Sequence, residues 1–182
     1  MSRARDISNG KFANGIELAD GDMTVASGHG INFSSNSNLS GMSGELFEHY
    51  EEGTYTPTLT PSTGGSIGVN TSYDKAAYTK VGRVVHVTGS IVSDSPSSAT
   101  GAVGVSLPFS IVNLGDEAGD FAGSVTISSL ASVNVAELTA FASEGGTTLD
   151  LHLGDNINPQ ADLAQEFSGN ETIHFGVTYF TT

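Results

Sequence analysis

The two parts of this chain meet at one stretch, Tyr50-Glu51-Glu52-Gly53-Thr54-Tyr55-Thr56-Pro57-Thr58-Leu59. Before it, short apolar pairs alternate with turns too often to build a core of their own. After it come longer alternating runs, which are typical of the strands of a β-sandwich. The stretch itself changes period, from a helical turn ending at Tyr50 to a strand beginning at Thr54. The sequence therefore predicts a thin stalk over residues 1–50 and a globular head over residues 51–182.

The composition favours β-structure and excludes several kinds of site. The 182 residues include 23 glycines, and only 14% of them are charged, a balance that suits strands and turns better than helices. Without cysteine the chain has no disulfide, zinc–thiolate site or thiol nucleophile. No apolar run reaches membrane-spanning length, and residues 1–15 lack a signal-peptide core. We expect a soluble chain with no membrane insertion and no cleaved leader.

The charge is strongly negative and unevenly placed. The formal net charge is −14, and half of the six basic residues, Arg3, Arg5 and Lys11, lie at the front. The other 171 residues hold three basic and nineteen acidic side chains, so they repel phosphate backbones and anionic lipid. We expect no nucleic-acid partner. The basic front could dock on an acidic partner, with a short solvated tail as the alternative.

A small apolar–polar–apolar unit recurs in the predicted stalk, at residues 16–18, 23–25 and 31–33, with turn-forming residues between the copies. Two apolar side chains per unit cannot offset the entropy of ordering its backbone. Copies of the chain wound around a shared axis would bury these side chains and share backbone hydrogen bonds. The preferred interpretation is three intertwined chains; the alternative is a flexible Gly/Ser/Asn linker.

A short helical turn is predicted at the end of the stalk. Met42, Leu46 and Tyr50 recur every four residues, with Ser43 available as an N-cap. Two turns are marginal as an isolated helix. In a trimer, three such turns could form an apolar plug under the head.

The head is predicted to be an antiparallel, jelly-roll-like β-sandwich, so that the whole chain is all-β. Pro57 marks an edge or a bulge, Gly82 a tight turn, and Ala131-Ser132 the centre of a hairpin. Residues 93–100, which hold Pro96, and residues 113–120 are expected to be polar loops. The strands are predicted at residues 54–60, 77–83, 84–92, 103–107, 121–130, 133–141, 149–153 and 173–180.

Alternation within these runs predicts which side chains face the core. His86, His152, His174 and Phe180 fall on the opposite parity, so we expect them on the outer face, with Phe180 at a subunit contact. The predicted inward set is Val85, Val87, Val105, Leu107, Val125, Ile127, Leu149, Leu151, Leu153, Ile173, Phe175 and Val177.

No residue pattern indicates catalysis. Glu51 and Glu52 are neighbours on a predicted strand and point to opposite faces, whereas a glycosidase needs two carboxyl groups that face one bond. No serine lies in a nucleophile elbow, and no His-x-x-x-His pattern exists. The segments Asp20-Gly21-Asp22 and Asp155-Asn156 read as turns and lack the EF-hand spacing. We expect no enzyme activity, no cofactor and no metal site; the alternative for the metal is an ion on a trimer axis, held by one histidine from each chain.

Several motifs together resemble tail-fibre and related appendage proteins of tailed bacteriophages, including marine ones. The matching segments are residues 30–34, 45–59, 78–85, 107–109 and 173–179; each is weak alone, and their order and spacing carry the resemblance. The resemblance implies a homotrimeric virion appendage, made in the host cytoplasm. It also implies a front segment docked on other virion proteins and a head that binds a host-surface receptor, a glycan among the candidates.

The resemblance supplies no binding residues, so candidates come from the predicted loop tips at 93–101, 113–120 and 154–170 and from exposed aromatic side chains. The function predicted is receptor recognition and host adsorption by a tail fibre or fibre tip. The alternative is a structural head fibre or capsid decoration protein without a receptor. The candidate receptor-binding residues are Tyr73, Ser95, Ser97, Asp116, Phe121 and Asn156.

Overall fold

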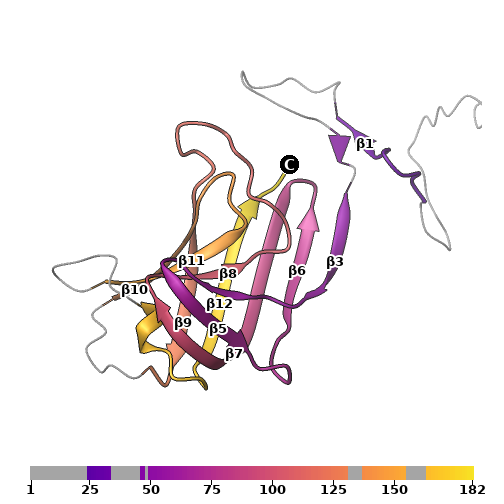
Figure 1. The fold of residues 1–182 in the computed structure, drawn as a ribbon. Helices are drawn as coiled ribbons and strands as arrows, with labels where there is room; N and C mark the ends of the chain where they lie inside the picture. The colour runs from indigo at the N-terminus through magenta and orange to yellow at the C-terminus, as the bar shows by residue number, and fades with distance from the viewer. Residues whose placement is uncertain (1–23, 34–45, 48, 131–136, 155–162) are drawn as a thin grey trace, which may run out of the picture. The chain divides into compact units, whose positions relative to one another are not determined.

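A computed structural model describes residues 24–33, 46–47, 49–130, 137–154 and 163–182 (Figure 1). The chain divides into two compact units, Met1–Glu48 and His49–Thr182. We refer to the second unit as the head. Among the described residues, no helix is long and apolar enough to cross a bilayer.

Within its described residues, the first unit contains a short antiparallel hairpin. It is formed by β1 (Ile31–Asn32) and β2 (Leu46–Phe47), with Ile31 opposite Phe47. β1 falls in the third predicted repeat, whereas residues 24–25 of the second are not in a strand. The first repeat lies outside the described residues.

The helical turn predicted to end at Tyr50 is wrong where the structure describes it. Leu46 lies in β2, and Tyr50 begins strand β3. Both find antiparallel partners, Asn32 and Val81, and such pairing outweighs a helical spacing that spans only two turns. Residues 42–45 lie outside the described part.

The described part of the head contains ten strands and one short 3-10 helix. They are β3 (Tyr50–Tyr55), β4 (Leu59–Pro61), β5 (Gly64–Val69), β6 (Ala76–Val81), β7 (Val84–Thr100), β8 (Val103–Ser106), β9 (Phe121–Ser128), β10 (Glu137–Ala142), β11 (Thr148–Gly154), η1 (Leu163–Glu166) and β12 (Thr172–Phe180).

The strand pairings of the head close into a ring. All pairs are antiparallel, in the order β12-β9-β10-β11-β8-β4-β5-β7-β6-β3, and β12 also pairs with β7. One side of the head therefore holds β3, β6, the first half of β7, β12 and β9. The other side holds β10, β11, β8, β4 and β5 (Figure 1). The predicted all-β antiparallel fold is confirmed, and β3 lies at an edge because it pairs with β6 alone among the described strands.

The core lies between the two sides and follows the predicted alternation. Ten of the twelve predicted inward side chains are buried, and the other two, Val125 and Ile127, are half-buried against the core. Alternating parity works here because one face of each strand packs inward while the other meets solvent. As predicted, Phe180 lies on the outer face and is 38% exposed.

Strand β7 is longer than the sequence predicted and belongs to both sides. Residues 84–92 pair with β12, whereas residues 93–100, expected to be a loop, pair with β5. This pairing contains two register shifts, and irregular pairing tolerates the missing N–H of Pro96. Gly65 (φ +79°) lies against Ser98: a Cβ at Gly65 would stand 2.2 Å from the Ser98 carbonyl oxygen. Glycine in β5 thus lets a polar run form a strand.

The turns are partly as expected. The β9–β10 pair places Ala140 opposite Gly123, whereas Ala131-Ser132, the predicted centre of the hairpin, lie outside the described residues. Gly82 (φ +57°) forms the tight β6–β7 turn. Pro57 is buried and separates β3 from β4, so the predicted single strand over 54–60 is two strands on opposite sides of the head.

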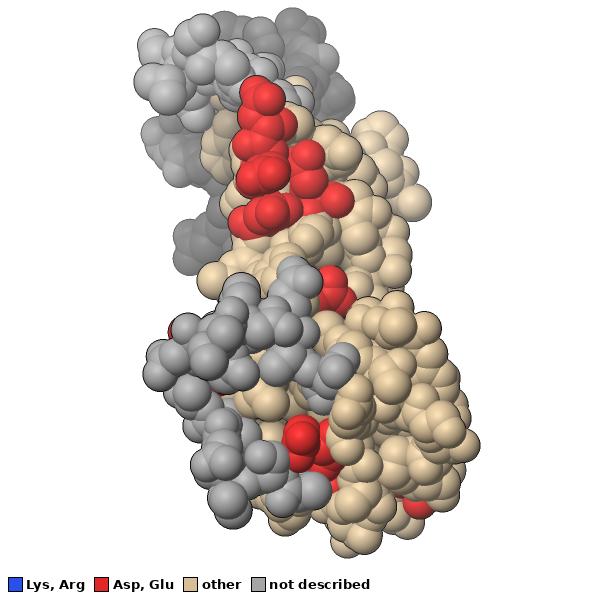
Figure 2. Space-filling view, turned by 60° about the vertical axis from the view of Figure 1, so that its left-hand side comes forward, with Lys and Arg blue, Asp and Glu red and all other residues tan. Residues whose placement is uncertain are grey.

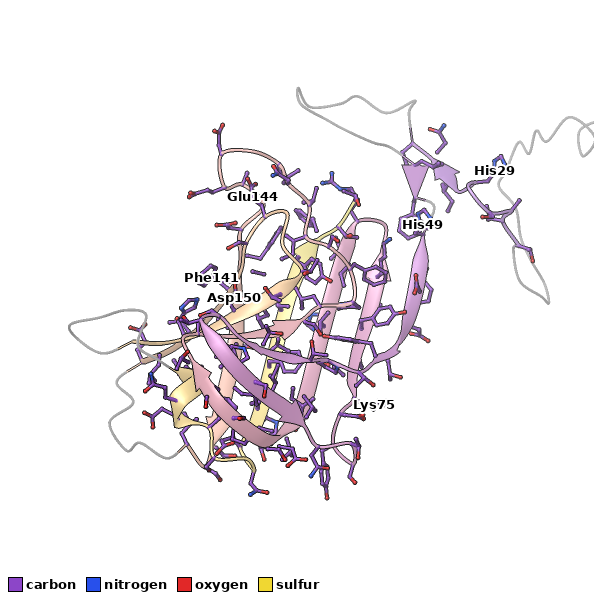
Figure 3. All side chains as sticks on the ribbon, viewed as in Figure 1. His29, His49, Lys75, Phe141, Glu144 and Asp150 are labelled. Carbon is purple, nitrogen blue, oxygen red and sulfur yellow. The ribbon has the colours of Figure 1, made fainter. Side chains whose placement is uncertain are left out.

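Hydrogen bonds define two ends of the head. At the His49 end, the Gly82 N–H donates to the His49 carbonyl (2.7 Å) and the Thr181 N–H to the Arg83 carbonyl (2.9 Å). At the Tyr73 end, the Val92 N–H donates to the Tyr73 carbonyl (3.1 Å). Figure 3 shows His49 and Lys75 at these opposite ends.

Candidate functional site

A hollow of about 440 Å³ lies on the outer surface of β4, β8 and β11. Hydroxyl groups, one carboxylate and one imidazole line it, over a floor of small residues. We call it the β4–β8–β11 hollow. Its lining residues are Thr60, Ser62, Thr63, Gly101, Ala102, Gly104, Thr148, Asp150 and His152.

The register of β4, β8 and β11 brings the lining residues of the hollow side by side. Gly104 of β8 lies opposite Thr60 of β4 on one side and Asp150 of β11 on the other. Because Gly104 has no side chain, bare backbone separates the two polar groups. A Cβ there would stand 3.1 Å from Asp150 Oδ1 and 3.3 Å from Thr148 Cγ2, so any larger residue would begin to fill the floor.

Alternation along β11 places its polar residues Asp150 and His152 on the outer face of the sheet. Leu149 and Leu151 are fully buried, which places Asp150 and His152 on the outer face. The His152 ring stacks on Phe141 of β10, with ring centroids 4.9 Å apart and planes inclined by 15°. Phe141 is also the direct neighbour of Asp150 across the β10–β11 pair (Figure 3). A half-exposed aromatic ring therefore flanks the carboxylate.

Much of the hydrogen-bonding capacity of this lining is unused. Ser62 Oγ accepts from the Ala102 N–H (2.9 Å), which leaves its hydroxyl proton available. His152 Nε2 is buried and has no partner among the described residues, a state that costs free energy. Within the same part of the chain, no side-chain hydrogen bond engages the hydroxyls of Thr60, Thr63 or Thr148, or the carboxylate of Asp150.

The electrostatic environment is acidic. Among the described residues, no Lys or Arg lines the hollow, and the face drawn in Figure 2 shows clustered Asp and Glu with no basic side chain visible. At the His49 end, Asp120 Oδ1 accepts from the Glu144 N–H (2.7 Å), and Glu144 Oε2 accepts from the Leu114 N–H (3.2 Å). Among the described residues, no three His, Asp or Glu side chains gather as a metal site would require.

Three predicted receptor residues lie toward the Tyr73 end or along β7. Tyr73 is 62% exposed in the turn after β5. Ser95 and Ser97 are exposed as predicted, but they lie in strand β7 and not in a loop. Ser95 has φ +44°, consistent with the irregular β5–β7 pairing.

The other predicted residues do not join them. Asp116 is exposed in the 113–120 turn, which follows Val112, whose N–H donates to the Phe180 carbonyl (2.8 Å) at the His49 end. Phe121 is half-buried and packs edge-on against Phe180, with centroids 5.3 Å apart. Asn156 lies outside the described residues. The described candidates thus fall at opposite ends of the head, and none lines the hollow.

Alternation along the sequence placed His152 on an outer face, but no sequence pattern singled out Asp150. One sequence feature could have pointed to Asp150: it alternates with Leu149 and Leu151, which are buried, so its side chain must lie on the outer face of β11. Alternation cannot show that Thr60 and Thr148 lie near Asp150, because strand order decides which outward residues become neighbours.

Glu51 and Glu52, which the sequence did not favour as a catalytic pair, each accept a hydrogen bond from a tyrosine. Glu51 accepts a hydrogen bond from the Tyr78 hydroxyl (2.5 Å) and Glu52 from the Tyr50 hydroxyl (2.8 Å). The hydrogen bond to Glu52 raises the pKa of Tyr50, and the one to Glu51 raises the pKa of Tyr78. His86 and His174 are exposed as expected, and His86 Nδ1 lies 2.9 Å from the Thr178 hydroxyl oxygen.

Comparison with known proteins gives a structural neighbour without sequence relatedness. No protein-family model and no curated protein matches the sequence. The fold is similar to part of the Dettilon tailspike protein, with a TM-score of 0.56 and 14% sequence identity. The match covers 72% of this chain and 24% of that one. At this identity the likeness concerns the fold: the chain shares a β-rich architecture with about a quarter of a tailspike.

Proposed function

We propose that this chain is a virion appendage protein of a tailed phage, a tail fibre or fibre tip, whose head recognises a host-surface receptor. The observation that carries the proposal is the fold similarity of 72% of the chain to part of a tailspike protein. The motifs that resemble phage appendage proteins support it independently. The proposed role is binding without catalysis.

The proposed assembly is a homotrimer. The β1–β2 hairpin has only two residues per strand, and an isolated two-stranded hairpin is marginal in water. Its apolar side chains Ile31, Leu46 and Phe47 are 42–46% exposed. Sister copies of the chain are the proposed cover for these side chains, as in an intertwined stalk.

An exposed apolar row on the head supports the same assembly. Tyr50, Val81, Val84 and Phe180 are direct neighbours across β3, β6, β7 and β12, and they are 37–65% exposed. We call these four residues the apolar row. It lies at the His49 end, beside the edge strand β3. Contiguous exposed apolar residues and uncovered strand edges commonly mark subunit contacts.

A competition assay tests the receptor role. Purified full-length chain is added to host cells before the phage that encodes it, and free phage is counted. The proposal expects a concentration-dependent fall in adsorption, because soluble heads occupy the receptors. Bovine serum albumin at equal mass is the control, and adsorption that stays unchanged at saturating chain would refute the receptor role.

Antibody labelling of intact particles separates the two structural assignments. Label at the tail tip is expected for a fibre or fibre tip. Label spread over the capsid would identify a head fibre or decoration protein, and would overturn the tail assignment.

A further inference from the structure

We propose that the β4–β8–β11 hollow binds a neutral saccharide unit, with Asp150 accepting hydrogen bonds from sugar hydroxyls. This inference rests on the proposed receptor role and deepens it, because it names the ligand class and a binding surface that contains none of the predicted receptor-binding residues. Three properties of the hollow carry it: its size, its polar groups without partners and its lack of positive charge.

The size and shape suit a small ring-shaped ligand. The volume of about 440 Å³ falls within the range of small-molecule sites. The small lining residues Ala102 and Gly104 present one methyl group and backbone, against which the C–H face of a sugar ring can lie. Gly104 keeps this floor open, since a Cβ would meet Asp150 Oδ1 at 3.1 Å.

The polar groups match a polyhydroxylated molecule. A sugar hydroxyl is both a donor and an acceptor, and so are the threonine and serine hydroxyls of this lining. Asp150 supplies an ionised acceptor, whose hydrogen bonds are stronger than neutral ones. The His152 ring lines the same wall, but its Nε2 is buried and is not among the groups that a ligand reaches. An apolar ligand would leave these groups unsatisfied.

Charge selects against acidic sugars. The lining contains one carboxylate and no Lys or Arg, in a chain with net charge −14. A uronic or sialic acid would bring a second negative charge near Asp150 without a cation to compensate it. The hollow should therefore prefer glucose or galactose to glucuronate, which differs from glucose only in the carboxylate at C6.

The test is ligand-observed saturation-transfer NMR on the full-length chain with glucose, galactose, N-acetylglucosamine and glucuronate. We expect transfer to at least one neutral sugar and weaker transfer to glucuronate. Asp150→Asn keeps the shape but removes the charge-assisted hydrogen bond, so the Kd for the neutral sugar should rise about tenfold. Glu52→Gln removes the same charge from an exposed position of β3, on the other side of the head, and should leave the Kd unchanged.

A second variant tests whether weaker sugar binding could come from misfolding of Asp150→Asn. Thr60→Val is nearly isosteric on the exposed side of β4, and it should weaken sugar binding while circular dichroism stays that of the parent. The inference is overturned if no neutral sugar shows transfer, if glucuronate binds as well as the best neutral sugar, or if Asp150→Asn and Glu52→Gln behave alike. Sugar binding that depends on Asp150, in a chain that does not block adsorption, would refute the receptor role and leave the hollow's ligand class standing.

Discussion

The carboxylate of Glu171 should be a major source of stability for the head. Glu171 is fully buried immediately before β12, and it accepts hydrogen bonds from the Ser168 N–H (2.9 Å), the Ser168 hydroxyl (2.7 Å) and the Gly169 N–H (3.0 Å). The Ser93 hydroxyl of β7 also donates to it. This carboxylate therefore ties the turn before β12 to the middle of β7.

The lowered pKa of Glu171 shows how much free energy the ionised carboxylate contributes to folding. Burial by itself raises the pKa, but the hydrogen bonds from Ser93 and Ser168 outweigh it and lower the pKa from 4.5 to about 2. A difference of this size corresponds to about 3 kcal/mol of stability when the carboxylate is ionised. Glu171→Gln keeps the shape and removes the charge, so the free energy of unfolding at pH 7 should fall by about 2–4 kcal/mol.

The pH dependence distinguishes this mechanism from simple loss of packing. The folded pKa lies below the unfolded one, so the stabilisation is present above pH 4.5 and is lost as the pH falls toward 2. Urea unfolding followed by circular dichroism at pH 7, 4 and 2.5, at one protein concentration, measures the gap in the free energy of unfolding between the parent and Glu171→Gln. We expect this gap to shrink steadily as the pH falls. Glu137→Gln, at an exposed position of β10, is the control and should show almost no gap at any pH.

A gap of the same size at pH 2.5 and pH 7 would refute the reasoning, because the loss would then come from shape and not from charge. A gap below about 1 kcal/mol at pH 7 would also refute it, since it would mean that burial cancels the hydrogen bonds.

Three further predictions concern assembly and packing. Val84→Glu, in the apolar row, should shift the full chain toward smaller species in sedimentation velocity. Leu114→Glu, at an apolar side chain of similar exposure (46%) outside the row, should not. If the two variants sediment alike, the apolar row is not part of the subunit interface. Gly65→Ala should lower the melting temperature more than Gly115→Ala, because both have positive φ but only the first would clash with backbone, at 2.2 Å; equal losses would contradict the close approach. Tyr179→Phe should cost about 1–3 kcal/mol in urea unfolding, because the buried hydroxyl donates to a backbone carbonyl at 3.0 Å. Burial raises the pKa of Tyr179 to about 12, so the parent should lose this stability between pH 10 and 12 and the variant should not; parallel alkaline profiles would count against it.

Local alternation predicted the parts of the fold that depend on burial. Leu149, Leu151 and Val87 face the core because strand parity and the need to bury apolar area agree at those positions. The sequence also predicted that β9 and β10 pair with each other, because two consecutive alternating runs commonly form antiparallel neighbours. These features depend on residues close in sequence.

The features that escaped prediction depend on partners far away in the chain. Residues 93–100 are polar and contain Pro96, yet they form a strand because the glycine-rich β5 accepts an irregular partner. Leu46 and Tyr50 have helical spacing but meet strands in space. The hollow is the clearest case: Thr60, Gly104 and Asp150 become neighbours only through the order β4-β8-β11. No window of sequence contains that order.

The placement of the apolar row and the hollow has a consequence for binding strength. The row lies on the outer face of β3, β6, β7 and β12, and the hollow on the outer face of β4, β8 and β11, which form the other side of the head. In the proposed assembly, heads that associate through the row would leave the described lining of each hollow uncovered. A single hollow with a few hydrogen bonds should bind a sugar weakly, whereas three hollows in the proposed trimer would bind a repeating surface polymer far more tightly. If the row holds the heads together, disrupting it should weaken adsorption to cells while the affinity for a free monosaccharide stays the same.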